Sequence, residues 1–288
     1  MCMIQDILPH HFDNVYHPRQ PRDEDLVLLY RQGSILIRRA DMPYLRVREL
    51  CDEDRAALQY LFAVDDTACY TLLGEMKRCP NGMEYVSTRW LRTLRPHVLA
   101  MIGISGHQLW SWYRSRTFCG GCGRLMHHDA HERMMRCAHC GRQEYPKICP
   151  AVIVAVVDRA RDAIVLTRYA GRQYQKYALI AGFCEIGETL EETVRREVME
   201  ETGLKVKHLR YYKSQPWSFT DTLLCGFFCE LEGSPLITRD ERELAEARWV
   251  KREDVPMDEE GISLTGEMMR VFREGSAFEE QGEGRGSE

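Results

Sequence analysis

The chain of 288 residues lacks the apolar run of about 20 residues that a membrane-spanning helix requires. Its first residues, MCMIQDILPHHFDN, also lack the basic stretch and apolar core of a secretory signal. The 39 basic and 44 acidic residues give a net charge of −5, which excludes a polybasic nucleic-acid binder as a description of the whole chain. We therefore expect no membrane attachment and a cytoplasmic location.

Disulfides are not expected either, although the chain has 12 cysteines, because thiols stay reduced where no export signal directs the chain outward. Four of them form two pairs, Cys119-x-x-Cys122 and Cys137-x-x-Cys140, separated by fourteen residues. Four thiolates in two such pairs are typical of a closed tetrahedral Zn²⁺ site, which leaves no open position for catalysis. The spacing predicts one structural zinc ion, and four unlinked thiols are the alternative.

Residues 1–117 carry no chemical motif, so a scaffold or dimerisation domain is the expected role. The runs DLVLLY and SILIRRA are joined by Arg31-Gln32-Gly33, which predicts a strand, a turn and a strand. The run LCDEDRAALQYLFAV, residues 50–64, has helical spacing, and Asp52 is placed to cap that helix. We therefore predict an N-terminal α/β region.

The rest of the chain divides into three segments. Residues 118–146 hold the two cysteine pairs and are predicted to form a zinc ribbon. Residues 147–273 show an α+β pattern, in which AVIVAVVD, AIVLTRY, HLRYYKS, LLCGFFCEL and ARWV are strand-like runs. The acidic, glycine-rich tail, residues 274–288, has too few apolar side chains to offset its ordering entropy, so we predict it to be disordered.

An acid-rich stretch, GFCEIGETLEETVRREVMEETGL, spans residues 182–204. Thr189 and Glu192 form a capping box that predicts the start of a helix, and Gly203 is a typical residue at a helix end. Glu197, Glu200 and Glu201 stand three and four residues apart, so they share one face of that helix.

Like charges on one helix face repel each other, and a hard divalent cation relieves that repulsion. Mg²⁺ prefers oxygen ligands and bridges to substrate phosphates, so the three glutamates predict a metal site. A solvated acidic helix face is the alternative that charge alone leaves open.

The complete pattern of the stretch decides between these interpretations. Gly182, Glu188 and the run Arg196-Glu197-Val198-x-Glu200-Glu201-x-Gly203-Leu204 match the Nudix box at every specified position. The chain thus resembles the Nudix hydrolases, which cleave nucleoside diphosphates linked to another moiety. This resemblance implies a mixed sheet sandwiched by helices, and it implies that Mg²⁺ or Mn²⁺ is held by Glu197, Glu200 and Glu201.

A second motif, SQPWSFTDT, lies at residues 214–222. It resembles the SQPWPFPxS mark of the NADH pyrophosphatase, or NudC-like, branch, which also carries a four-cysteine ribbon before the Nudix domain. Ser218 and Thr220 replace prolines, and Thr222 replaces serine. Because proline stiffens a chain by fixing φ, their loss predicts a looser recognition loop. A turn with a core Trp217 is the structural alternative.

The resemblance implies a role for each matching residue. Glu201 is the expected base, with Glu200 beside it, and Arg196 is expected to pair with Glu188 and orient the loop. The backbone carbonyl of Ala181 and the carboxylate of Glu243 are further implied metal ligands. The implied substrate contacts are Glu132, Tyr145, Phe183, Gln215, Pro216, Trp217, Ser218, Phe219, Thr220, Asp221, Thr222 and Thr265. Gly182 and Gly203 are implied structural positions.

The activity implied by the resemblance is metal-dependent hydrolysis of NAD(H) to nicotinamide mononucleotide and AMP, with removal of the NAD cap from RNA, by a homodimer. A Nudix hydrolase that prefers ADP-ribose or another dinucleotide is an alternative. A regulator that senses a nucleotide without cleaving it is a further one. The box is complete and no helix-turn-helix is evident, which favours the enzyme.

One stretch departs from the acidic balance of the chain. Residues 85–128 contain six arginines and no lysine, aspartate or glutamate, so the stretch carries a charge of +6. Its arginines either pair with acidic segments elsewhere or form a surface that follows the phosphates of an RNA. The six residues are Arg89, Arg92, Arg95, Arg114, Arg116 and Arg124.

Overall fold

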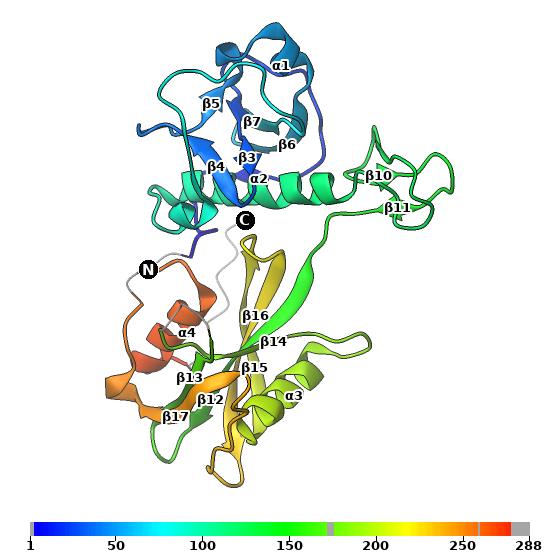
Figure 1. The fold of residues 1–288 in the computed structure, drawn as a ribbon. Coiled ribbons are helices and arrows are strands. Elements are labelled where there is room, and N and C mark those ends of the chain that lie inside the picture. The colour runs from blue at the N-terminus through cyan, green and yellow to red at the C-terminus, as the bar shows by residue number, and fades with distance from the viewer. Residues whose placement is uncertain (1–2, 172–175, 259, 278–288) are drawn as a thin grey trace, which may run out of the picture. The chain divides into compact units, whose positions relative to one another are not determined.

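The computed structural model describes residues 3–171, 176–258 and 260–277 (Figure 1). The chain divides into two compact units. The C-terminal unit comprises Met1–Met3, Cys149–Trp217 and Thr222–Glu288, and the N-terminal unit comprises Ile4–Ile148 together with Ser218–Asp221. Among the described helices, none is long and apolar enough to cross a membrane.

A six-stranded mixed sheet forms the centre of the C-terminal unit. Its path runs β15-β16-β12-β13-β17, and β14 pairs with β12 off that path. The neighbours β12 and β16 are parallel, whereas the other pairs are antiparallel. The strands are β12 (Cys149–Asp158), β13 (Ala163–Tyr169), β14 (Ile180–Phe183), β15 (Lys205–Trp217), β16 (Thr222–Glu232) and β17 (Leu244–Lys251). The predicted α+β class with a mixed sheet is confirmed.

The alternation of side chains along β12 gives this sheet two apolar faces. Val152, Val154 and Val156 pack in one cluster with α3 (Leu190–Thr202). Ile153, Ala155 and Val157 pack in the other cluster with α4 (Leu264–Arg273). Figure 1 shows these two helices on opposite sides of the strands. The sheet is therefore sandwiched by helices, with a short 3₁₀ turn, η3 (Arg252–Asp254), after β17.

Helix α3 begins and ends where its sequence signals lie. The hydroxyl of Thr189 accepts a hydrogen bond from the Glu192 amide, and the Glu192 carboxylate accepts one from the Thr189 amide. At the other end Gly203 has φ 70°, a left-handed conformation that costs glycine little. The helix thus presents the acidic stretch in a fixed register.

The N-terminal unit, apart from the ribbon, holds two sheets and one long helix. The sheets have the orders β1-β6-β7-β2-β5 and β3-β4-β8. Their strands are β1 (Phe12–Asp13), β2 (Leu26–Val27), β3 (Tyr30–Arg31), β4 (Ser34–Ile37), β5 (Leu45–Arg46), β6 (Gln59–Val64), β7 (Thr67–Thr71) and β8 (Glu84–Ser87). The helical elements are η1 (Val47–Glu49), α1 (Asp52–Ala56), η2 (Thr88–Arg92) and α2 (His97–Ser115).

Glycines on α2 let this helix lie close to the sheets. The Tyr30 hydroxyl donates to the Gly103 carbonyl at 2.7 Å, and the Tyr44 hydroxyl donates to the Leu99 carbonyl at 2.6 Å. A β-carbon added at Gly103 or Gly106 would lie 2.4 Å from one of these hydroxyl oxygens. The close approach of α2 therefore depends on glycine at both positions.

The predicted helix over residues 50–64 is wrong beyond its first turn. Only Asp52–Ala56 is helical, Cys51 rather than Asp52 is the N-cap, and Gln59–Val64 is strand β6. Tyr60, Leu61 and Phe62 are buried there, and β6 pairs antiparallel with β7. Aromatic side chains in a sheet core outweigh the helical spacing, which is a weak signal over so few residues.

The ribbon is part of the N-terminal unit and contains a three-stranded sheet of order β11-β10-β9. Its strands are β9 (His127–His128), β10 (Met135–Arg136) and β11 (Gln143–Glu144). The rings of Tyr113 on α2 and His128 lie 4.8 Å apart, and Arg116 pairs with Glu144 at 3.5 Å. These contacts attach the ribbon to the end of α2.

The tail that we predict to be disordered, residues 274–288, is described only in part. The amides of Gly275 and Ser276 donate to the carbonyls of Phe272 and Val271, and Ala277 packs against the α4 core. Residues 278–288 lie outside the described residues.

Candidate active site and zinc centre

Arg196 is the centre of the acidic face of α3. Its Nε donates to Glu188 at 2.6 Å, and its Nη2 donates to the same carboxylate and to the Phe183 carbonyl, both at 2.9 Å. Its Nη1 contacts Glu197 at 2.7 Å and Glu200 at 3.0 Å. One guanidinium thus joins the loop before the helix, the end of β14 and two box glutamates.

The hydrogen bond from Arg196 lowers the pKa of Glu188 to about 2, with help from the Glu185 amide and the Thr193 hydroxyl. Thr193 donates to this carboxylate at 2.9 Å. Glu188 is therefore ionised under all ordinary conditions and serves as a fixed anchor for the loop.

Glu197 is in the opposite situation, because it is buried with only 9% of its surface exposed. Burial raises its pKa against the lowering by Arg196, and the charges of Glu200 and Glu243 raise it further. A β-carbon on Gly182 would lie 1.9 Å from the carboxyl carbon of Glu197. The carboxylate therefore lies directly on the backbone of Gly182 in β14, and any other residue there would displace it.

The remaining proposed metal ligands lie on neighbouring elements. Glu200 is exposed on α3, whereas Glu201 is only 2% exposed. Ala181 precedes Gly182 on β14 and pairs with Ile153. Glu243 lies in the turn just before β17.

Backbone contacts hold the segment before β17 against the end of α3. The Thr238 amide donates to the Thr202 carbonyl at 2.8 Å, and the Asp240 amide donates to the Glu201 carbonyl at 3.1 Å. The amide of Glu243 then closes a turn onto the Asp240 carbonyl. This arrangement brings Glu243 close enough to influence the pKa of Glu197.

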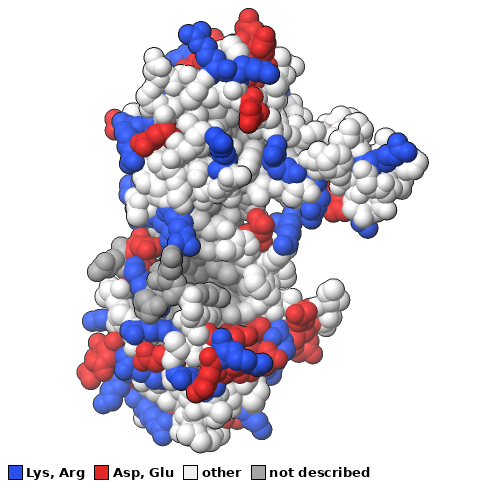
Figure 2. Space-filling model, in the orientation of Figure 1, with Lys and Arg blue, Asp and Glu red and all other residues white. Residues whose placement is uncertain are grey.

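Carboxylate and carbonyl oxygens are the ligand type that a hard divalent cation prefers. Burial is the largest cause of the raised pKa of Glu197, and the charges of Glu200 and Glu243 add to it. Within the described part of the chain, the four cysteines alone form a group of ligand atoms that all lie within 4.8 Å of one another, so the glutamate oxygens are more widely spaced. On the face drawn in Figure 2, acidic side chains gather beside basic ones over the region of α3. A bound cation would neutralise the excess acid that Arg196 only partly compensates.

Two of the proposed substrate contacts meet within the N-terminal unit. The Tyr145 hydroxyl donates to the Glu132 carboxylate at 2.9 Å, and this contact raises the pKa of Tyr145. The Tyr145 side chain is 53% exposed. Phe183, at the end of β14 in the other unit, is 54% exposed, so its ring is free to stack on a flat ligand.

The SQPW motif is strand rather than loop, which corrects the loop prediction for its first part. Ser214–Trp217 is the end of β15, and Thr222 is the first residue of β16. Among the substrate contacts proposed here, Pro216 and Trp217 pair with Leu223 and Thr222 across the hairpin.

Only Ser218–Asp221 forms the turn between β15 and β16, and these residues cluster with the N-terminal unit. Ser218 is buried, and the guanidinium of Arg92 lies 5.7 Å from the centre of the Phe219 ring. Thr220 is exposed, and Asp221 has a positive φ of 56°. Contacts within the N-terminal unit therefore shape the turn that lacks the two prolines.

Gln215 and Thr265 are both associated with the start of α4. The buried Gln215 amide bonds to the Ile262 carbonyl and the Leu264 amide. Thr265 is the second residue of α4 and is half-buried.

Sequence reasoning missed a buried acid on α4. Glu267 is 5% exposed and accepts hydrogen bonds from the Tyr212 hydroxyl at 2.8 Å and from Lys213. These bonds, with Lys213 foremost, lower the pKa of Glu267 against the effect of burial. Lys213 immediately precedes the SQPW motif, but nothing in the sequence pairs it with a residue on α4.

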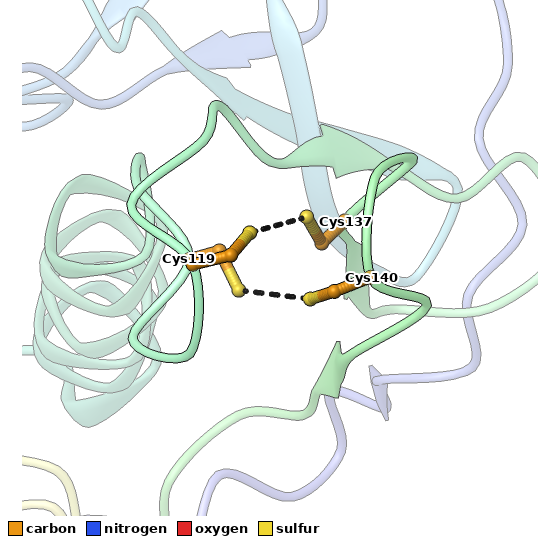
Figure 3. A group of neighbouring side chains, drawn as sticks. Cys119, Cys137 and Cys140 are labelled. Atoms are coloured by element: carbon orange, nitrogen blue, oxygen red, sulfur yellow. Dashed lines mark hydrogen bonds between the residues drawn. The ribbon is translucent and has the colours of Figure 1, made fainter.

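The four predicted zinc ligands converge in the ribbon. Their sulfur atoms all lie within 4.8 Å of one another, and the distances Cys119–Cys140 and Cys122–Cys137 are both 3.5 Å. Figure 3 shows the thiols of Cys119, Cys137 and Cys140 pointing toward one another. Tetrahedral Zn–S bonds of about 2.3 Å would separate the sulfurs by roughly 3.8 Å. The cluster therefore fits a structural zinc ion.

Backbone amides prepare one of these thiols for metal binding. Amide hydrogen bonds from Cys140 and His139 lower the pKa of Cys137 to about 6. The turn geometry depends on Gly123 and Gly141, which have φ values of 73° and 76°. Their amides donate back to the carbonyls of Cys119 and Cys137.

Comparison with known proteins finds a family model that is similar to much of the C-terminal unit. The model of the NUDIX domain matches residues 147–272. The chain is 45% identical over 152 residues to the NAD-capped RNA hydrolase NudC of Salmonella heidelberg (strain SL476) and to that of Salmonella typhi. Each match covers 53% of this chain and 58% of the relative, so the chain matches little more than half the length of these relatives.

Solved structures of the family resemble the chain more loosely. A NUDIX hydrolase from Nitrosomonas europaea has a TM-score of 0.46 and 22% identity, covering 55% of this chain and 91% of that protein. The box residues and their geometry agree with the family match over residues 147–272. Residues 147–272 are therefore similar to the NUDIX domain, and the chain is similar in sequence to these NudC relatives over about half of its length.

Proposed function

We propose that the chain is a hydrolase that cleaves the pyrophosphate of NAD(H) to nicotinamide mononucleotide and AMP, and that it also removes the NAD cap from RNA. The observation that carries this proposal is the cluster of carboxylates around Arg196 in the Nudix domain, with Glu197 seated on Gly182. The 45% identity to proteins named NAD-capped RNA hydrolase supports the choice of substrate.

Glu197, Glu200, Glu201, Glu243 and the carbonyl of Ala181 are the proposed ligands for Mg²⁺ or Mn²⁺, the cations that Nudix hydrolases use. The cation would supply charge neutralisation for the pyrophosphate oxygens and would lower the pKa of a water molecule.

The chain's own residues would arrange and assist the reaction. Glu201 would accept a proton from the attacking water, as a buried carboxylate with a restricted orientation. Arg196 and Glu188 would hold the loop that leads into α3, so that the Ala181 carbonyl and the glutamates keep their positions.

Flat parts of the substrate require flat partners. The exposed ring of Phe183 would stack on the nicotinamide end, while Glu132 and Tyr145 would contact the substrate as a hydrogen-bonded pair. The residues Pro216, Trp217, Ser218, Phe219, Thr220, Asp221, Thr222 and Thr265 are the further proposed contacts. A structural zinc ion in the ribbon, a homodimer and a cytoplasmic location complete the proposal.

Product analysis tests the activity directly. Purified protein with Mg²⁺ or Mn²⁺ would be incubated with NADH, NAD, ADP-ribose and a diadenosine polyphosphate, and the products would be separated by chromatography. We expect nicotinamide mononucleotide and AMP from the dinucleotides that carry nicotinamide. A clear preference for ADP-ribose would favour the alternative Nudix hydrolase, and binding of nucleotide without turnover would favour a sensor. Light scattering would give the mass in solution and test the homodimer.

A further inference from the structure

Gln215 on β15 is fully buried, with 0% of its surface exposed. Its Nε2 donates to the Ile262 carbonyl at 2.9 Å, and its Oε1 accepts from the Leu264 amide at 2.7 Å. Leu264 is the first residue of α4, so its amide is one of the donors that a helix leaves without an internal partner. The side chain therefore acts on the start of α4 from a neighbouring strand.

This geometry conflicts with a direct contact between Gln215 and substrate. A primary amide offers one acceptor oxygen and two N–H donors, and here both its oxygen and its nitrogen already bond to backbone. A side chain without exposed surface also presents no atom to a ligand outside the core. Gln215, which the resemblance treats as a substrate contact, is thus built into the protein interior.

The bonds of Gln215 fix the segment that leads into α4. Ser263 lies between the two bonded residues and caps the helix by accepting from the Gly266 amide at 3.2 Å. Thr265, the next residue after Leu264, is half-buried and is one of the proposed substrate contacts. The position of Thr265 is therefore set by a residue on β15.

A second set of bonds joins the same strand to the same helix. Tyr212 and Lys213 of β15 both donate to the buried carboxylate of Glu267, one turn of α4 further on. Strand β15 and the first turns of α4 are consequently held together at two levels, by Gln215 at the helix start and by Glu267 inside the helix.

We propose that Gln215 is a positioning residue, which anchors the N-terminus of α4 and thereby places Thr265 toward the substrate, and that it does not itself bind the substrate. This proposal rests on the proposed function for its effect on catalysis. The anchoring itself is a property of the protein without ligand, so the two can be tested separately.

The first test measures hydrogen exchange of the Leu264 amide by NMR in the ligand-free protein. Gln215→Met keeps the length of the side chain but removes its acceptor, so exchange at Leu264 should accelerate on the order of tenfold. The Glu267 amide, which donates to the Ser263 carbonyl, serves as the internal reference for general loosening of the helix. Unchanged exchange at Leu264 in this variant would overturn the anchoring.

The second test uses Gln215→Glu, which reproduces the shape of the amide. A protonated carboxyl can donate to the Ile262 carbonyl and accept from the Leu264 amide. An ionised carboxylate has no proton to donate, so one of its oxygens faces the Ile262 carbonyl oxygen without a hydrogen bond. Burial favours the neutral form, so the anchor should be intact below the pKa of the new group and lost as pH rises through it.

In Gln215→Glu, we expect the KM for NADH to rise with pH and kcat to change less than KM. The wild type should not show this pH dependence of KM. Gln215→Met should show the raised KM at every pH. A raised KM in Gln215→Met together with unchanged Leu264 exchange would instead mean that the amide contacts the substrate. If the wild type does not hydrolyse NADH, the proposed function fails, while the exchange measurement still decides the anchoring.

Discussion

At the scale of single residues, Gly182 has a role that its lack of a side chain defines. The Glu197 carboxylate occupies the space where a β-carbon would stand, at 1.9 Å from the carboxyl carbon. This contact couples strand β14 to the acidic face of α3. It also keeps Glu197 partly desolvated, which raises its pKa.

Gly182→Ala should weaken Mg²⁺ binding by about 10–100-fold, because it displaces a proposed ligand without touching the helix core. Calorimetric titration with Mg²⁺ would measure the loss. Gly74→Ala is the matched control, since an added β-carbon there meets no atom within 4 Å. Equal Mg²⁺ affinity of both variants and the wild type would contradict the placement of Glu197 in the metal site.

Glu201→Gln should reduce hydrolysis of NADH by about 10²–10⁴-fold, the usual contribution of a general base. Its size is unchanged, so thermal stability and zinc content should stay near those of the wild type. Glu191→Gln, in the exposed first turn of α3, is the control and should keep full activity. More than a tenth of wild-type turnover in Glu201→Gln would remove Glu201 from the mechanism.

The pH dependence of metal binding follows from Glu197. Because its pKa in the folded protein lies above the ordinary value of 4.5, its ionisation costs stability as pH rises through the raised pKa. Mg²⁺ offsets this cost and competes with the proton. The increase in melting temperature on adding Mg²⁺ should therefore be small in mild acid and grow toward neutral pH.

Thermal melts with and without Mg²⁺ across this pH range would measure that increase. Glu197→Gln, which does not titrate, should show a smaller and flatter response. An increase in the wild type that is the same in mild acid and at neutral pH would mean that Glu197 does not compete with the metal for a proton.

At the scale of elements, the ribbon depends on its metal more than on its small core. Each of its strands has only two residues, and the chain crosses between them in turns shaped by glycine. Such a segment gains much of its folding free energy from zinc.

Cys137→Ser should lower zinc content and thermal stability together, because Cys137 is fully buried in the cluster and its thiolate is favoured by neighbouring amides. Metal analysis and a melting curve would measure both quantities. Cys79→Ser, at an exposed cysteine outside the ribbon, is the control. Wild-type protein that contains far less than one zinc per chain would contradict the ribbon.

At the scale of the whole molecule, the arginine-rich stretch of residues 85–128 has two possible roles. Its arginines either pair with acidic residues elsewhere in the protein or contact the phosphates of an RNA. Arg116 pairs with Glu144, as the structural interpretation expects. Arg114 donates to the carbonyl of Leu73, a contact that carries no net charge on the acceptor, and Arg124 is exposed. The stretch thus keeps positive charge available at its surface.

We predict that rising salt weakens activity on NAD-capped RNA more steeply than on NADH, because an RNA adds one phosphate per nucleotide. Each lost phosphate contact to a single strand lowers the slope of log affinity against log salt concentration, the salt slope, by about 0.7. Arg114→Gln combined with Arg124→Gln should therefore reduce the slope for capped RNA by about 1.4 and leave NADH unaffected. Equal slopes for both substrates would assign the stretch to structure alone.

The sequence by itself determined the features whose residues lie close together along the chain. The cysteine pairs, the capping box of α3 and the shared face of its glutamates depend on spacing within a few residues, so local geometry dictates them. Five of the six strands of the mixed sheet were readable too, since β12 (Cys149–Asp158), for example, contains the apolar run of residues 151–157. Strand β14 (Ile180–Phe183) was not among the predicted runs.

Tertiary structure alone decided the contacts between distant segments. Helix α1 stops at Ala56 because Gln59–Val64 pairs with β7, and Glu243 lies near Glu197 because its turn bonds to the end of α3. Gln215 likewise meets Ile262 and Leu264 across the packed core. Such contacts arise when elements bury their apolar faces against one another, and no local pattern records which distant partner that burial will supply.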